Sequence, residues 1–85
     1  MDELKQQIKQ IIVESLMLED VQPEGIGDEL PLFGEGLGLD SVDALELAVE
    51  FERAFGVTFP EAARSREVFR TVSTLAAYVQ EHRVR

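Results

Sequence analysis

Few residues in this chain could perform chemistry without help from another protein. The 85 residues include no cysteine and a single histidine, His82, which lies near the C-terminal end and far in sequence from any candidate nucleophile. The acidic residues of 28–40 lack the spacing of a calcium loop, and the glycines of 34–38 lack the lysine of a phosphate-binding loop. Acid–base catalysis needs paired carboxylates held in a pocket, for which so short a chain has little room. The sequence therefore predicts a protein that is not an enzyme.

Ser41 is the residue whose surroundings best suit modification by another enzyme. It follows a glycine-rich stretch and Asp40, at the point where a helix is expected to begin. A phosphate on its oxygen would lie near the helix N-terminus, where free N–H groups and the helix dipole favour an anion. Ser41 has no local base to activate it, so an outside enzyme would be needed. A serine in this position can also be a simple helix cap, and the residues alone leave both interpretations open.

The helix that begins here is predicted over 41–55, with Asp40 or Ser41 as its cap. A helical projection gives it an acidic arc, an opposite apolar arc and a third, apolar stripe beside the acids. These three sets are Asp43, Glu46, Glu50 and Arg53; Ala44, Leu47, Ala48, Phe51 and Phe55; and Val42, Leu45 and Val49. Because more than half of the circumference is apolar, the helix is either central in the fold or in contact with a partner.

The remaining elements are also helical. Further helices are predicted at 2–18, at 64–69 and at 72–83. A long loop at 19–40 holds five of the six glycines, and its leucines and Phe33 are expected to hold it against the core. No pair of strands is visible. The pattern predicts an all-α, four-helix bundle with a long loop between helices 1 and 2 and a short third helix, in a single domain over 1–85.

The net charge of −9 is unevenly distributed. Residues 10–52 include 12 acids and no lysine or arginine, whereas 53–85 include six arginines against three glutamates. Such an acidic block should attract basic partners and repel nucleic acid, although acidic faces also serve simply to keep small proteins soluble. No apolar run reaches the roughly 18–20 residues of a membrane helix, and the polar N-terminus is not a signal peptide. We expect a cytoplasmic protein that binds neither nucleic acid nor membrane.

Around Ser41 the sequence resembles a known family. The run LDSVDALEL at 39–47 is similar to the phosphopantetheine attachment motif of acyl carrier proteins. The run FERAFGVTFP at 51–60 resembles the segment that follows this motif in the same family, and Thr71-Val72 matches the usual start of its last helix. The resemblance covers nearly the whole chain and is weakest in 19–36.

This resemblance implies a four-helix bundle and a known chemistry. A phosphopantetheinyl transferase would attach 4'-phosphopantetheine from coenzyme A to Ser41, with Asp40 beside it, and the thiol of the arm would carry acyl groups as thioesters. The setting would be fatty-acid, polyketide or specialised lipid biosynthesis. The resemblance also implies that acyl-transferring and acyl-modifying enzymes with basic patches dock on the surface formed by Val42, Asp43, Leu45, Glu46, Val49 and Glu50. Carriers of this type are usually monomers, and we expect a monomer here.

Four arginines depart from the usual fatty-acid carrier. Arg53 and the arginines at 64, 66 and 70 stand where such carriers tend to be acidic, which favours a specialised stand-alone carrier. Two alternatives remain. A peptidyl or aminoacyl carrier more often has Gly-Gly before the modified serine pair, where this chain has Gly38-Leu39. The other is an unmodified acidic helical interaction module in which Ser41 is only a cap.

Overall fold

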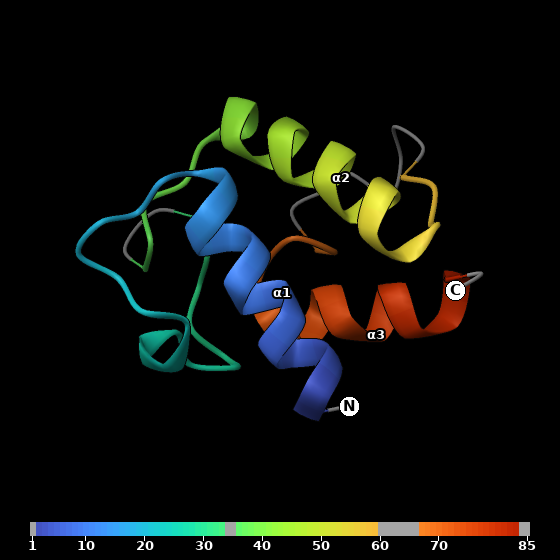
Figure 1. Ribbon diagram of the computed structural model, residues 1–85, viewed down its shortest axis with the longest axis horizontal. Helices are drawn as coiled ribbons and strands as arrows, with labels where there is room; N and C mark the ends of the chain where they lie inside the picture. The colour runs from blue at the N-terminus through green and yellow to red at the C-terminus, as the bar shows by residue number, and fades with distance from the viewer. Residues whose placement is uncertain (1, 34–35, 60–66, 84–85) are drawn as a thin grey trace.

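The computed structural model describes residues 2–33, 36–59 and 67–83. The described chain forms three α-helices and one 3-10 turn: α1 (Asp2–Ser15), η1 (Pro23–Gly25), α2 (Ser41–Phe55) and α3 (Val72–His82). In Figure 1, α1 crosses α3 and runs beside α2, and it packs against both helices and against η1. Within the described ranges the only extended pairing is an isolated bridge between Phe33 and Leu39. The predicted all-α class is therefore confirmed.

The predicted fourth, short helix is not confirmed by the described residues. Of the short helix predicted at 64–69, residues 64–66 lie outside the described chain, and residues 67–69 form a turn instead of a helix. The turn leads directly into the cap of α3, where Thr71 Oγ1 accepts a hydrogen bond from the amide of Thr74 at 3.2 Å. Among the described residues the fold thus rests on three helices rather than four.

The helix α1 is shorter than predicted because the backbone reverses at Met17. The helix ends at Ser15 instead of residue 18. Met17 has a φ of 53°, the amide of Leu18 donates to the carbonyl of Val13 at 3.0 Å, and the amide of Met17 donates to that of Glu14 at 3.4 Å. This is the Schellman ending, in which the left-handed position is usually glycine. The apolar pattern continues past the true end of the helix, because Leu18 still packs on the core.

A group of aromatic rings in the core joins α2 to α3. The ring of Phe51 on α2 lies 6.2 Å from that of Phe59 and 6.5 Å from that of Phe69, between ring centroids. Phe59 in turn stacks on Tyr78 of α3 at 4.9 Å. The predicted core arc of α2 is confirmed, since the buried residues of this helix are Ala44, Leu47, Ala48, Phe51 and Phe55. α2 is therefore held firmly by one face, which leaves its other faces to the outside.

The loop between α1 and α2 is pinned to the core, as its leucines predicted. Leu32 and Leu39 are buried; the amide of Leu32 donates to the carbonyl of Arg70, and the amide of Leu39 donates to that of Leu32, both at 2.9 Å. Glycine is required at Gly36, because a Cβ there would lie 1.6 Å from the carbonyl oxygen of Pro31. The end of the loop consequently delivers the start of α2 to a defined place.

Asp28 fastens the same loop to the two other helices. Its carboxylate pairs with Lys9 at 2.7 Å and with Lys5 at 3.3 Å, and its backbone carbonyl accepts from the amide of Ser73 at 3.0 Å. The hydrogen bond from Lys9, and then the one from Lys5, lower the pKa of Asp28. This residue therefore connects the loop, α1 and the first turn of α3.

Candidate attachment and docking site

The N-terminus of α2 is closed by a pair of aspartates rather than by the serine between them. Asp40 is the N-cap, and its Oδ1 accepts a hydrogen bond from the amide of Asp43 at 3.0 Å. Asp43 Oδ2 accepts in return from the amide of Asp40 at 3.1 Å. This reciprocal arrangement is a capping box, which satisfies two backbone donors that the helix itself leaves free. The sequence left the choice of cap open between Asp40 and Ser41, and the geometry assigns it to Asp40.

Ser41 therefore does not cap the helix. It is the first residue of α2, its side chain is exposed, and its hydroxyl forms no hydrogen bond with any described residue. The amides of the first turn and the positive end of the helix dipole lie beside it. An anionic group on Ser41 Oγ would be stabilised at this end of the helix, and a second protein could reach the hydroxyl from solvent.

The imidazole of His82 does not lie near Ser41. His82 ends α3, its ring stacks on that of Tyr78 with centroids 4.2 Å apart, and its Nδ1 lies 2.9 Å from the carbonyl oxygen of Tyr78. Figure 1 places this C-terminal end far from the start of α2. No group of three metal-ligating side chains occurs among the described residues. Within the described ranges, Ser41 therefore lies beside carboxylates of the capping box and far from the imidazole.

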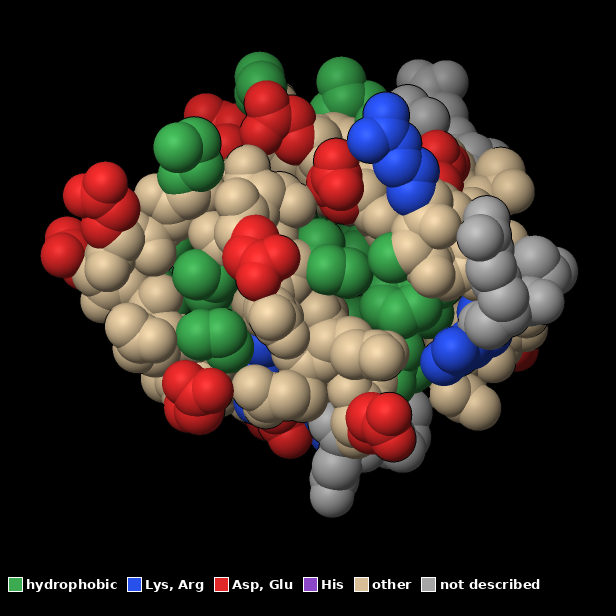
Figure 2. All heavy atoms as spheres, viewed as in Figure 1, with side chains coloured by type: hydrophobic (Ala, Val, Ile, Leu, Met, Phe, Trp, Pro, Cys, Tyr) green, Lys and Arg blue, Asp and Glu red, His purple; other side chains and the backbone are tan. Residues whose placement is uncertain are grey.

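The apolar stripe of α2 lies outside the core. The exposed fractions of Val42, Leu45 and Val49 are 63%, 49% and 41%. These side chains are therefore not packed into the core. In Figure 2 hydrophobic and acidic side chains alternate over the upper surface, where Figure 1 places α2. Large apolar side chains that gather on an otherwise polar surface are typical of contact sites for other proteins.

Some of the acidic side chains beside this stripe already bind groups of the chain itself. The carboxylates of Asp40 and Asp43 are bonded within the capping box. Glu50 pairs with Arg53 one turn later, with 3.8 Å between oxygen and nitrogen. Glu46 is exposed and forms no ion pair with a described residue, so its charge is the one most available to a partner. The shared arc of Glu50 and Arg53 agrees with the helical projection.

One contributor to this surface was missed by sequence reasoning. Ser15, at the end of α1, lines a cavity of about 470 Å³ along the side of α2, together with Leu45, Glu46, Val49 and Glu50. Nothing in the sequence indicates this contact, because Ser15 is 30 positions before Leu45 and sits in no motif.

Of the arginines that depart from fatty-acid carriers, Arg70 is exposed, whereas 64 and 66 lie outside the described residues.

Comparison with known proteins identifies the family of the chain. Residues 6–79 match the family described as "Phosphopantetheine attachment site". The chain is 36% identical over 83 residues to the acyl carrier protein of Zymomonas mobilis subsp. mobilis, an alignment that covers 98% of this chain and 99% of the relative. None of the described helices is both long and apolar enough to cross a membrane. The chain therefore belongs to the acyl carrier protein family, whose members are carriers, and it acts as a carrier with phosphopantetheine as its prosthetic group.

Proposed function

We propose that Ser41 is the residue that carries phosphopantetheine. The observation that carries this proposal is the division of labour at the start of α2: Asp40 and Asp43 cap the helix, and the hydroxyl of Ser41 is left exposed. The residues present fit the group, because a phosphodiester on Ser41 Oγ would lie at the positive end of the helix dipole. Among the described residues no other serine starts a helix.

The attachment reaction follows from what the chain has and lacks. Ser41 Oγ forms a bond to the phosphorus of the phosphopantetheinyl group, the pyrophosphate bond of coenzyme A breaks, and the nucleotide part leaves. The hydroxyl proton passes to a base of the transferase, since the nearest imidazole, His82, is at the far end of α3. The bound group supplies the thiol that holds acyl cargo as a thioester. The capping box keeps the attachment point fixed while partners approach.

Intact-mass measurement tests this proposal. The apo protein is incubated with coenzyme A and a phosphopantetheinyl transferase, and one adduct of phosphopantetheine is expected. Ser41→Ala should remain unmodified. Ser73→Ala, which removes a serine that bonds to Glu29 instead, should be loaded like the wild type. No adduct with several transferases, or an adduct that persists in Ser41→Ala, would overturn the assignment.

We further propose that partner enzymes dock on the outer side of α2. The surface combines the exposed side chains of Val42, Leu45 and Val49 with the carboxylates of Asp43, Glu46 and Glu50. Apolar contact would supply affinity, and the acids would steer basic partners into register. Glu46→Lys should raise the KM of a partner enzyme for the carrier about tenfold, since it replaces an attraction by a repulsion.

Salt provides the independent check on this docking surface. The wild-type KM should rise as ionic strength increases, because exposed charges are screened, and Glu46→Lys should lose most of that dependence. Gln80→Ala, on the exposed face of α3, is the control substitution. A KM that is indifferent both to Glu46→Lys and to salt would mean that the acidic arc is only a solvated face.

Further proposals concern the oligomeric state, location, fold and pathway of the carrier. We place it as a monomeric, cytoplasmic, single-domain protein of 1–85 with a four-helix bundle, and as a specialised stand-alone carrier. Arg53 supports the last point, since it offsets part of the charge of Glu50 on the docking side. Housekeeping fatty-acid enzymes should therefore turn over this carrier more slowly than their own. Equal turnover would contradict the specialised assignment.

The alternatives are less well supported. An aminoacyl carrier would share the attachment chemistry, and competition between acyl and aminoacyl loading enzymes distinguishes the two. The unmodified interaction module requires Ser41 to be a cap, whereas Asp40 holds that position.

A further inference from the structure

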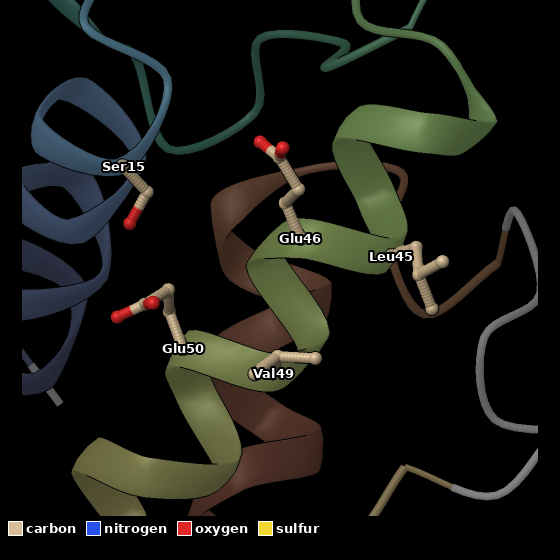
Figure 3. A pocket seen from close by; sticks show the side chains of 5 residues that line it. All are labelled: Ser15, Leu45, Glu46, Val49 and Glu50. Atoms are coloured by element: carbon tan, nitrogen blue, oxygen red, sulfur yellow. The ribbon is translucent and has the colours of Figure 1, made fainter.

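A groove separates the C-terminal end of α1 from the middle of α2. Its volume is about 470 Å³. Figure 3 shows the side chain of Glu50 extending toward α1, that of Glu46 extending upward beside it, that of Ser15 extending from α1 into the space between, and those of Leu45 and Val49 on the other side of α2. α2 thus forms a ridge with one acidic flank, which faces the groove, and one apolar flank.

The groove offers negative charge, which among the described residues only the exposed Arg53 offsets in part. No lysine or arginine occurs between residues 10 and 52, and the last turn of α1 has no basic residue. The C-terminal end of a helix dipole is itself negative. Arg53 pairs with Glu50 from a side chain that is 77% exposed, and Glu46 has no ion pair among the described residues. The charge of this groove therefore suits a basic side chain from another protein.

Met17 adds an apolar contact at the same end of α1. It lies two residues after Ser15, so its backbone is within about 7 Å of the groove wall. Its side chain is 81% exposed, the highest value among the large apolar residues described. Its φ of 53° is one that glycine adopts freely and that side chains with a Cβ adopt at a steric cost. A strained and exposed methionine serves the fold poorly, which is the reason to ask what it contacts.

We propose that the end of α1, from Ser15 to Met17, forms one half of the docking surface for the phosphopantetheinyl transferase. A basic side chain of the transferase lies in the groove against Glu46 and Glu50, and an apolar side chain lies on Met17. The transferase is the occupant because it alone must reach the unmodified Ser41, and Figure 1 shows the end of α1 beside the half of α2 that begins there. The inference rests on the proposed function, since it assumes that Ser41 is loaded.

Met17→Gly separates a docking role from a structural one. Glycine relieves the strain, so the urea midpoint of unfolding should rise. Loss of the apolar contact should nevertheless raise the KM of the transferase for the apo carrier about three- to tenfold with little change in kcat. Met17→Asn, which also tolerates the left-handed conformation, should behave alike. Met17→Leu should restore most of the loss, and Gln80→Ala is the control.

A second variant tests the groove itself. Ser15→Arg places a cation of the chain's own between Glu46 and Glu50, so it should raise the KM and weaken its dependence on salt, whereas Ser15→Gln should change the KM less. Loading of the wild type is measured first, and no loading would overturn the proposed function. Normal loading with a KM within twofold of wild type in both Met17→Gly and Ser15→Arg would overturn the groove proposal alone.

Discussion

The same capping motif opens α2 and α3, in two opposite environments. At α2 the box is made by Asp40 and Asp43, and at α3 by Thr71 and Thr74, each pair bonded reciprocally between side chain and amide. Asp40 is exposed, whereas Thr71 is 4% exposed. The residue that follows the cap is the exposed Ser41 in α2 and the fully buried Val72 in α3.

The difference shows how one local motif serves two purposes. Polar groups that leave water must be paired, and the neutral threonines achieve this at α3 without burying a charge. At α2 the cap stays in water, where aspartates are favourable and reinforce the helix dipole. The first residue of α3 is therefore available for packing, and the first residue of α2 is available for chemistry.

The largest change in stability is expected when the residue types that begin α3 and α2 are exchanged. Val72→Ser replaces a buried valine by a polar side chain and should lower the free energy of unfolding by about 3 kcal/mol, as measured by urea denaturation. Ser41→Val should change it by no more than about 0.5 kcal/mol, because the site is exposed and uses no hydroxyl. Similar losses in both variants would mean that Ser41 is part of the fold.

Removing each cap should give an intermediate effect. Thr71→Ala should cost about 2 kcal/mol, because it leaves the amide of Thr74 without a partner in a partly buried place. Asp40→Ala should cost about 1 kcal/mol, since water can replace the lost bond. Thermal unfolding followed by circular dichroism gives both values. A greater loss in Asp40→Ala would contradict the division between a structural and a presenting cap.

Replacement of Asp28 should give the smallest change in stability, and this change should depend on pH. It supports the start of α3 through Ser73, while its carboxylate binds Lys9 and Lys5. Its pKa is lowered from 3.8 in the folded protein, so the pairing stabilises the fold above that pH and is lost as the pH falls through the folded pKa. Asp28→Asn should be slightly less stable than wild type at pH 7, and the difference should vanish in acid. A difference that persists below the folded pKa would assign the effect to the backbone.

The regular elements of the fold could be predicted where apolar spacing and caps agree. α2 was expected over 41–55 and is found there, and α3 ends one residue before the predicted 83. α1 was overestimated because a left-handed methionine leaves no trace in the apolar pattern. Of the short helix predicted at 64–69, the described residues 67–69 form a turn that leads into the cap of α3.

The candidate site could be predicted only in part. The motif around Ser41 indicated a carrier, but it did not decide whether Asp40 or Ser41 caps α2, since both side chains can accept the same hydrogen bond. Exposure places Val42, Leu45 and Val49 outside the core, and exposure depends on which face of α2 the other segments cover. The participation of Ser15 depends on the packing of α1 against α2, which no local pattern specifies.

The most direct test of the central claim is to locate the modification by peptide mapping. Because no lysine or arginine lies between Lys9 and Arg53, trypsin releases residues 10–53 as one peptide, which contains Ser15 and Ser41, while Ser65 and Ser73 fall in other peptides. After loading with coenzyme A and a transferase, fragmentation of the 10–53 peptide should place the phosphopantetheine on Ser41. Its location on Ser15, Ser65 or Ser73 would contradict the account.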